Sequence, residues 1–153
     1  MDINTPTIRP AEQPDVEKIK NCVDRAYEHY TERIGKKPGP ILDDYSKIVR
    51  NHQAFVAVLE SRLVGVCVLI RKKGGILLDN IAVHPEFQNR GLGRKLIEFC
   101  ESKVRKQGFS KLDLYTNVLM TENISLYQRL GYAETKRLTE KGFNRVYMSK
   151  TLI

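Results

Sequence analysis

A short segment with two glycines and three cations has the residue types of a phosphate-binding turn. It consists of Gln88-Asn89-Arg90-Gly91-Leu92-Gly93-Arg94-Lys95 and follows an apolar run that ends at Pro85. The first turn of a helix carries backbone N–H groups without intrahelical partners and the positive end of the helix dipole, which together favour an anion. Gly91 and Gly93 would let an anion approach that backbone, because neither carries a side chain. The segment therefore predicts a site for phosphate groups.

The charges of this segment support the same interpretation. Arg90, Arg94 and Lys95 lie where the helix dipole would favour acidic residues if no anion were bound. Two common phosphate motifs are excluded. A dinucleotide fingerprint needs glycine at the position of Leu96, and a P-loop needs Gly-Lys followed by serine or threonine. The alternative is that the two glycines serve only a tight turn before a helix.

The apolar pattern of the chain predicts the elements that position this turn. Strands are expected over residues 7–9, 54–59, 63–70, 76–83, 111–116, 133–139 and 144–152. Helices are expected over residues 14–34, 43–51, about 91–108, and 121–130. Residues 36–40 are expected to be irregular, because two prolines flank a glycine. The order of these elements predicts one mixed α/β domain over residues 1–153.

The composition is that of a soluble globular protein. Of 153 residues, 41% are hydrophobic and 29% are charged. No apolar run approaches the roughly 20 residues of a membrane span, and residues 1–6 lack the basic and apolar regions of a signal peptide. Cys22, Cys67 and Cys100 are odd in number and lie among apolar residues, which favours buried free thiols in a reducing compartment. We therefore expect a cytoplasmic protein with no membrane partner and no metal, since no Cys/His spacing has the pattern of a metal site.

The net charge of +8 favours an anionic partner, whether nucleic acid, acidic membrane or a phosphorylated cofactor. Acidic residues are interspersed along most basic stretches, and the sharpest basic cluster coincides with the glycine turn. Nucleic-acid-binding proteins usually gather basic and aromatic residues on one surface. We therefore favour a phosphorylated cofactor, expect no nucleic acid, and keep a nucleic-acid-binding protein as the less favoured alternative.

The segment Gln88-x-x-Gly91-x-Gly93 resembles the acetyl-CoA signature Q/R-x-x-G-x-G/A of the GNAT superfamily of N-acetyltransferases. The preceding residues 80–85 and the later run Leu126-Tyr127-Gln128-Arg129-Leu130-Gly131-Tyr132 strengthen the likeness, because the run is similar to the family's pattern L-Y-x-x-x-G-F/Y. The order of elements resembles the family from end to end. The resemblance implies a GNAT-like α/β fold, in which about four helices flank a central mixed, mostly antiparallel sheet of about seven strands with a splay between the fourth and fifth.

The resemblance also implies acetyl-CoA as the cofactor and a set of residues that hold it. The pyrophosphate is expected on the backbone of residues 88–94, and the pantetheine arm is expected to pair like an added strand with residues 81–83. Many members carry an asparagine at the position of Met120. Asn123 lies about one helical turn from Tyr127 and is expected to take the place of that asparagine. The cofactor-binding prediction comprises Ile81, Ala82, Val83, Gln88, Asn89, Arg90, Gly91, Leu92, Gly93, Arg94, Lys95, Asn123 and Tyr127.

The family's chemistry, carried onto this sequence, is direct transfer of the acetyl group to a primary amine in a ternary complex. Tyr127 is predicted to be the general acid that protonates the departing thiolate, with core packing as the alternative. The amine must also lose a proton, and one frequent glutamate position of the family holds Tyr115 here. Asp79 is our candidate base, followed by Asp113, and proton removal through water or a structural salt bridge for both aspartates stays open.

The acceptor is expected to contact the first helices and the final hairpin, as in the family. The predicted substrate-binding residues are Tyr27, Tyr30, Tyr45 and Tyr147, with core packing as the alternative for the first two. The acceptor itself is left as a small-molecule amine, a protein N-terminus or a lysine, and the protein as a monomer or a homodimer. The main rival function is a coenzyme A-binding sensor that keeps this fold without catalysis.

Overall fold

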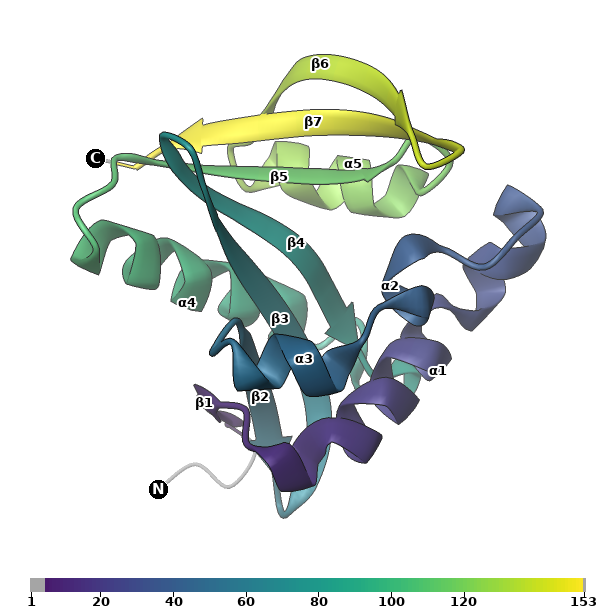
Figure 1. The fold of residues 1–153 in the computed structure, drawn as a ribbon, viewed down its shortest axis with the longest axis vertical. Helices are drawn as coiled ribbons and strands as arrows, with labels where there is room; N and C mark the ends of the chain where they lie inside the picture. Colours follow the sequence, from purple (N-terminus) through teal and green to yellow (C-terminus); the bar gives the residue numbers. More distant parts are fainter. Residues whose placement is uncertain (1–4, 153) are drawn as a thin grey trace. The chain divides into compact units, whose positions relative to one another are not determined.

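The computed structural model describes residues 5–152 and contains one seven-stranded sheet with helices in the order shown in Figure 1. The strand order is β1-β2-β3-β4-β5-β7-β6, and the β4–β5 pair is parallel. The strands are β1 (Thr7–Pro10), β2 (Ala54–Leu59), β3 (Arg62–Lys72), β4 (Gly75–Val83), β5 (Lys111–Asn117), β6 (Ala133–Glu140) and β7 (Phe143–Thr151). The helices are α1 (Val16–Ile34), α2 (Gly39–Leu42), α3 (Tyr45–Arg50), α4 (Leu92–Lys106) and α5 (Thr121–Arg129). The predicted α/β class and mixed, mostly antiparallel sheet are confirmed.

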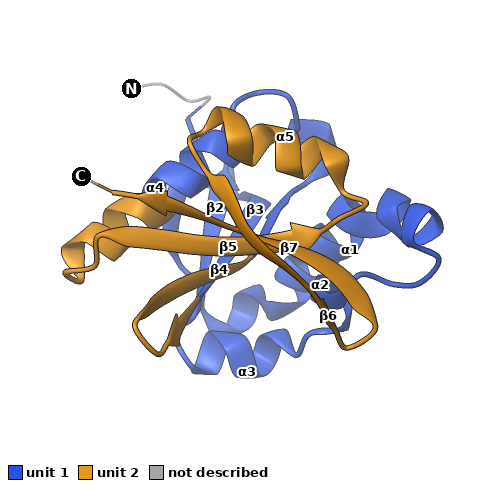
Figure 2. Ribbon diagram, turned by 90° about the horizontal axis from the view of Figure 1, so that it is seen from above, with its two compact units in different colours: residues 1–69, 80–99 blue, residues 70–79, 100–153 orange. Residues whose placement is uncertain are grey.

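The chain divides into two compact units, which are coloured separately in Figure 2. Within the described residues, the first unit comprises 5–69 and 80–99, and the second comprises 70–79 and 100–152. Strands β3 and β4 and helix α4 each contribute residues to both units. The expectation of a single domain over residues 1–153 stays a prediction.

Helix α1 forms in the first unit because its apolar residues recur every three or four positions. The side chains that it buries are Ile19, Cys22, Val23, Ala26, Tyr27 and Tyr30. Asp15 precedes the helix and accepts a hydrogen bond from the backbone N–H of Glu12 at 2.8 Å. Arg9 of β1 donates to both oxygens of the same carboxylate, at 2.8 and 3.1 Å. The helix start is therefore tied to the first strand by a buried carboxylate.

The expectation of an irregular segment over residues 36–40 is wrong for its last two residues. The short helix α2 begins at Gly39 and includes Pro40 in its first turn. Proline fits there, because the first helical N–H groups have no intrahelical partner and the fixed φ of proline suits the helix. Helix α3 begins at Tyr45 rather than Asp43, and Asp44 caps it by accepting from the N–H of Lys47 at 3.2 Å.

Glycine in β3 lets helix α4 lie close to the sheet of the first unit. A Cβ placed on Gly65 would lie 3.0 Å from Leu96 Cδ1 and 3.4 Å from the carbonyl oxygen of Ala82. The first turns of α4 therefore pack directly on β3 and the end of β4, where a larger residue would hold them apart. This packing fixes the start of α4, where the glycine turn (residues 88–95) enters the helix.

The second unit is built around β5, which pairs with β7 along its whole length and with β4 over a short stretch. The antiparallel register with β7 runs from Lys111 opposite Thr151 to Asn117 opposite Arg145. The parallel register with β4 joins Leu77 to Asp113 and Leu78 to Leu114. This pairing is much shorter than the two strands themselves, as the expected splay between the fourth and fifth strands requires.

The three cysteines are buried, as predicted. Cys22 is 1% exposed, and Cys67 and Cys100 are fully buried. Burial raises the pKa of the Cys22 thiol to about 12, although a backbone hydrogen bond from His84 opposes it. Over residues 5–152, no helix combines the length and apolar character that crossing a bilayer would require. Nor do any three His, Cys, Asp or Glu side chains in that range gather closely enough to hold a metal ion.

Candidate functional site

The loop between β4 and α4 is held in shape by its own side chains. After Val83, His84 caps a single turn of 3-10 helix, η2 (Pro85–Phe87), by accepting at Nδ1 from the N–H of Glu86 at 3.2 Å. The His84 side chain is buried, and burial lowers its pKa, so the imidazole is a neutral acceptor. Gln88 turns back and donates from Nε2 to the carbonyl oxygen of Val83 at 3.0 Å. These contacts fix the path of the chain into the glycine turn.

The glycine turn leaves its backbone uncovered on one side. Asn89 and Gly91 adopt positive φ angles of 63° and 79°, and a Cβ on Gly91 would meet no atom within 4 Å. Helix α4 has no acidic residue in its first turn, so its positive end is not neutralised there. Arg94 pairs with Glu98 at 3.0 Å, and the Arg90 guanidinium lies 5.3 Å from the centre of the Phe87 ring. The turn therefore offers backbone N–H groups and cations in open space, which suits a phosphate.

A cavity of about 220 Å³ lies beside this turn in the first unit. Its lining is largely apolar, with two cations among the residues Pro6, Leu59, Val64, Phe87, Arg90, Leu92 and Lys95. Three of these residues, Arg90, Leu92 and Lys95, belong to the predicted cofactor-binding set.

The predicted acceptor residues of the first helices are joined by hydrogen bonds to the end of β4. The Tyr27 hydroxyl lies 2.8 Å from both Asn80 Oδ1 and the carbonyl oxygen of Ile81. The Asn80 amide donates to the Tyr45 hydroxyl at 2.9 Å, and Tyr45 donates to the carbonyl oxygen of Pro40 at 2.6 Å. This chain of buried polar groups fixes α1, α2 and α3 against the strand expected to receive the pantetheine arm.

All three tyrosines of this region are largely buried, which fits the packing alternative as well as a binding role. Tyr27 and Tyr30 are 6% exposed and Tyr45 is 3% exposed. The Tyr30 ring lies 3.9 Å from the His29 ring and 6.2 Å from the Tyr27 ring, centre to centre. Their contact with an acceptor stays a prediction.

In the second unit, the candidate base Asp79 has a partner that the sequence interpretation did not assign to it. The Tyr115 hydroxyl donates to Asp79 Oδ1 at 2.7 Å. The register that pairs Leu77 with Asp113 carries Asp79 beside Tyr115, two residues further along both strands. Asp79 lies two residues after Leu77 and Tyr115 two residues after Asp113, so each pair lies on one face of its strand. This two-residue spacing on neighbouring parallel strands was the signal in the sequence that could have indicated the Asp79–Tyr115 contact.

The second candidate base, Asp113, is bound in ion pairs. Its Oδ2 lies 2.6 Å from Lys72 Nζ and 4.0 Å from Lys111 Nζ. Burial alone would raise the pKa of Asp113, but hydrogen bonds from Lys72 and Ser149 and the two lysine charges bring it below its ordinary value. A carboxylate with a lowered pKa holds a proton poorly, so the structure favours a structural role for Asp113 over that of a base.

Tyr147 belongs to a cluster of aromatic and charged side chains next to Tyr115. The two tyrosine rings lie 5.5 Å apart, and the Arg145 guanidinium lies 4.5 Å from the centre of the Tyr115 ring. The Tyr147 hydroxyl donates to Glu140, whose carboxylate also lies 3.9 Å from Arg145. Burial and the neighbouring Glu140 raise the pKa of Tyr147 to about 12, so its phenol is protonated and acts as a donor at neutral pH.

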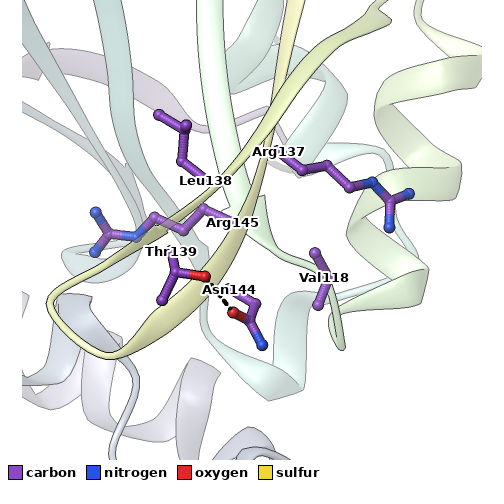
Figure 3. A pocket seen from close by; sticks show the side chains of 6 residues that line it. All are labelled: Val118, Arg137, Leu138, Thr139, Asn144 and Arg145. Carbon is purple, nitrogen blue, oxygen red and sulfur yellow. Dashed lines mark hydrogen bonds between the residues drawn. The ribbon is translucent and has the colours of Figure 1, made fainter.

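The β6–β7 hairpin also lines a pocket of about 310 Å³ (Figure 3). Its lining residues are Val118, Arg137, Leu138, Thr139, Asn144 and Arg145. Figure 3 shows the guanidinium groups of Arg137 and Arg145 extending in opposite directions, while Thr139 donates to Asn144 Oδ1 at 2.7 Å. The expected acceptor hairpin thus carries a mixed polar and apolar hollow next to the tyrosine cluster.

The candidate acid Tyr127 lies on α5 in the second unit and is 3% exposed. Its ring packs edge-on against Tyr132, with centres 6.2 Å apart and planes at 67°. Asn123 lies on the same helix, and its amide approaches the Met120 sulfur at 3.6 Å, as does the Thr116 hydroxyl at 3.4 Å. Asn123 therefore lies next to Met120, and its substitution for the family asparagine stays a prediction.

Comparison with known proteins assigns the family. Residues 50–134, more than half of the chain, match the family model described as the acetyltransferase (GNAT) domain. The chain belongs to the GNAT acetyltransferase family. The matched residues run from the end of α3 into β6 and contain the glycine turn, Asp79 and Tyr127.

Similar proteins agree with this family. The [ribosomal protein bS18]-alanine N-acetyltransferase of Escherichia coli K12 is 40% identical over 57 residues, which are 37% of this chain and 38% of that protein. The chain therefore matches about two fifths of the length of such curated relatives. The solved structure of the E. coli ribosomal-protein-S18-alanine N-acetyltransferase aligns with a TM-score of 0.74 at 20% identity, covering 96% of this chain and 94% of that chain. The PaiA N-acetyltransferase of Thermoplasma acidophilum, solved in complex with coenzyme A, aligns with a TM-score of 0.79 at 18% identity, covering 96% and 99%. At these identities the structural likeness shows the fold.

Proposed function

We propose that this chain transfers an acetyl group from acetyl-CoA to a primary amine. The observation that carries the proposal is the open glycine turn at the start of α4, which lies inside the segment that matches the GNAT model. An uncovered helix start with Arg90, Arg94 and Lys95 and no acidic residue in its first turn suits the phosphate groups of coenzyme A. That PaiA N-acetyltransferase was solved with coenzyme A supports the same cofactor here.

With the phosphate groups at the glycine turn, the other parts of coenzyme A contact the following residues. Backbone N–H groups of residues 88–94 bind the pyrophosphate, and Gly91 leaves the space that the phosphate needs. The backbone of Ile81, Ala82 and Val83 receives the amide-bearing pantetheine arm in the manner of an added strand. Asn123, beside Met120 on α5, supplies a side-chain contact.

Tyr127 serves as the general acid of the proposed reaction. The amine nitrogen attacks the thioester carbonyl carbon, the carbon–sulfur bond breaks, and the phenol of Tyr127 gives its proton to the departing thiolate. A phenol can hydrogen-bond to the departing thiolate and can give it a proton as negative charge develops on the sulfur. The buried position of Tyr127 on α5 supports this role, because a preorganised donor needs no rearrangement.

Asp79 is the residue that we propose to take the proton of the amine. Its rival Asp113 is bound to Lys72, whereas Asp79 is hydrogen-bonded to the neutral hydroxyl of Tyr115. A carboxylate held by a neutral donor keeps a free oxygen and can accept a proton directly or through one water molecule.

A peptide or protein amine is the acceptor that we favour over a small molecule. The E. coli relative is named for acetylating an alanine of ribosomal protein bS18. The hollow on the β6–β7 hairpin and the adjoining Tyr115–Tyr147 cluster offer polar and aromatic contacts to such a chain. We place the reaction in the cytoplasm, because three buried free thiols suit a reducing compartment.

The test measures release of the coenzyme A thiol from acetyl-CoA in the presence of three amine probes. They are a peptide that begins with alanine, a lysine peptide with a blocked N-terminus, and a small polyamine, with product mass as the second readout. Acetylation of the alanine peptide is the expected result. Binding of acetyl-CoA without transfer to any probe would favour the coenzyme A sensor, and absence of cofactor binding would overturn the proposal.

A further inference from the structure

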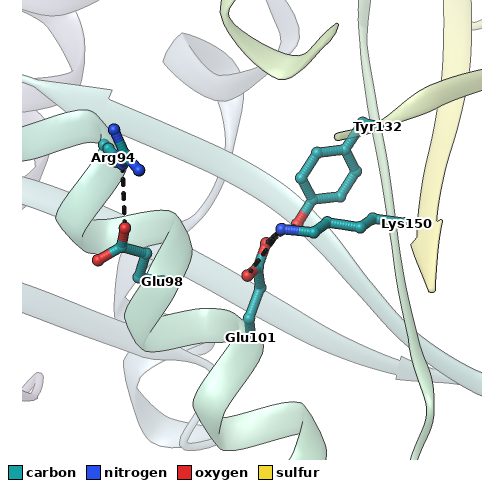
Figure 4. A network of polar contacts seen from close by, with 5 residues as sticks. All are labelled: Arg94, Glu98, Glu101, Tyr132 and Lys150. Carbon is teal, nitrogen blue, oxygen red and sulfur yellow. Dashed lines mark hydrogen bonds and ion pairs between the residues drawn. The ribbon is translucent and has the colours of Figure 1, made fainter. Parts of the chain in front are cut away.

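A buried ion pair in the second unit joins three segments that are distant in sequence (Figure 4). Glu101 lies on α4 and is 5% exposed. Its carboxylate accepts hydrogen bonds from Lys150 of β7 at 3.1 and 3.2 Å. It also accepts from the hydroxyl of Tyr132, between α5 and β6, at 2.8 Å. One carboxylate therefore satisfies a cation and a phenol in the core of this unit.

The same helix carries an ion pair of a different kind, which Figure 4 shows for comparison. Arg94 and Glu98 lie 3.0 Å apart, a similar distance, but their side chains are 67% and 59% exposed. An exposed pair of this kind contributes little, because water screens it. The Lys150 and Glu101 side chains are only 28% and 7% exposed. Burying such a pair costs desolvation free energy, and apolar residues could fill the same space at less cost, so stability alone does not account for the pair.

The third member of the network connects it to Tyr127. The Tyr132 hydroxyl is held by Glu101, its backbone N–H donates to the carbonyl oxygen of Tyr127 at 3.0 Å, and its ring packs against the Tyr127 ring at 6.2 Å. Burial and the hydrogen bond to Glu101 raise the pKa of Tyr132 far above its ordinary value, so the phenol is protonated and always donates. Both the hydroxyl and the backbone of Tyr132 are thus held by hydrogen bonds, and its ring packs against the ring of Tyr127.

We propose that Glu101 and Lys150 are positioning residues for Tyr127, acting through Tyr132. Lys150 holds the carboxylate of Glu101, the carboxylate holds the Tyr132 hydroxyl, and the fixed Tyr132 ring sets the orientation of the Tyr127 ring. The catalytic consequence of this proposal rests on the proposed function, in which Tyr127 is the general acid. The orientation itself does not depend on the reaction.

The experiment follows Tyr127 by fluorine NMR in protein labelled with fluorotyrosine, in which Y127F identifies the Tyr127 signal among the seven tyrosines. Y132F removes one oxygen and keeps the ring and the ion pair, and E101Q removes the charge that holds Lys150. We expect the Tyr127 signal to shift or broaden in both variants. The matched control is E134Q, which breaks the exposed Glu134–Arg137 pair at 2.5 Å in the same unit and is expected to leave the signal unchanged.

Turnover provides the second readout, with the alanine peptide as probe. Because a small misplacement of a reacting group can cost about a hundredfold, we expect kcat in Y132F to fall by between about tenfold and a hundredfold. The dissociation constant for acetyl-CoA is expected to change by less than about twofold, which a general loss of structure would not allow. E101Q/K150M removes both charges and keeps an amide oxygen for Tyr132, so we expect it to restore the signal and much of kcat.

An unchanged Tyr127 signal and unchanged kcat in folded Y132F would overturn the proposal and leave the network a purely structural role. If Y132F does not fold, E101Q/K150M decides, and failure to restore what E101Q loses contradicts the proposal. If the unaltered protein binds acetyl-CoA but acetylates no probe, the proposed function fails, while the NMR signal still tests whether the network orients Tyr127.

Discussion

Replacing Gly91 with alanine separates the strain of the glycine turn from its role in binding. Gly91 has a φ of 79° and open space around the added Cβ, so the variant gains no clash with another atom. Gly74, in the turn between β3 and β4, has a φ of 81° and the same open surroundings. Gly74→Ala is therefore a matched control with the same backbone strain at a position outside the site.

The expected magnitudes follow from these two environments. A left-handed backbone costs a residue with a Cβ about 1–2 kcal/mol, so both variants should lose about this much free energy of unfolding. In Gly91→Ala the methyl group would also enter the open space beside the turn, where the phosphate is proposed to bind. Losing one hydrogen bond to a charged group costs about 1.5–3 kcal/mol, which corresponds to about a tenfold to hundredfold higher dissociation constant.

Chemical denaturation measures the first quantity, and calorimetric titration with acetyl-CoA measures the second. We expect equal losses of stability in the two variants and weaker cofactor binding in Gly91→Ala alone. Equal dissociation constants for Gly91→Ala and Gly74→Ala would mean that the open side of the turn has no part in binding acetyl-CoA.

Three further predictions concern the second unit. Y127F should lower kcat by at least about tenfold with little change in acetyl-CoA affinity, and equal losses in both would contradict the acid role. D79N, Y115F and the double variant should lower kcat by similar factors, because the two side chains act as one hydrogen-bonded pair; additive losses in free energy would contradict this coupling. The pKa of Tyr147 is raised to about 12, so its contribution to stability is present below pH 10 and is lost as the pH rises towards 12. An absorbance titration of Y147F should therefore lack a step near pH 12, and loss of a step near pH 10 instead would contradict the assignment.

The parts of the fold that depend on local patterns could be predicted from the sequence. The spacing of apolar residues predicted α1 and α4, and Gly35 and Gly108 indicated where they end. The predicted ends of both helices lie within two residues of the observed ones. The path of the glycine turn likewise depends on residues next to one another, and Gly91 adopts the positive φ that favours glycine. Helix α2 was missed because proline was taken as a breaker, whereas it is tolerated in a first helical turn.

The parts that depend on contacts between distant residues could not be predicted in this way. Glu101 meets Tyr132 and Lys150 across 31 and 49 positions, and no repeating pattern relates such separations. Asp79 and Tyr115 are 36 positions apart and meet only through the register of two parallel strands. Side-chain partners of this kind decide which aspartate is bound by lysine and which is held by a neutral phenol, and they follow only from the folded chain.

Calorimetric titration of the purified protein with acetyl-CoA, compared with acetyl-CoA that lacks its 3′-phosphate, measures cofactor binding at the glycine turn. We expect micromolar binding of the intact cofactor and weaker binding of the truncated form, because the cations around the glycine turn favour each added phosphate charge. Absence of binding at millimolar acetyl-CoA would contradict the central claim, and membership of the GNAT family would then describe the fold of this chain without its activity.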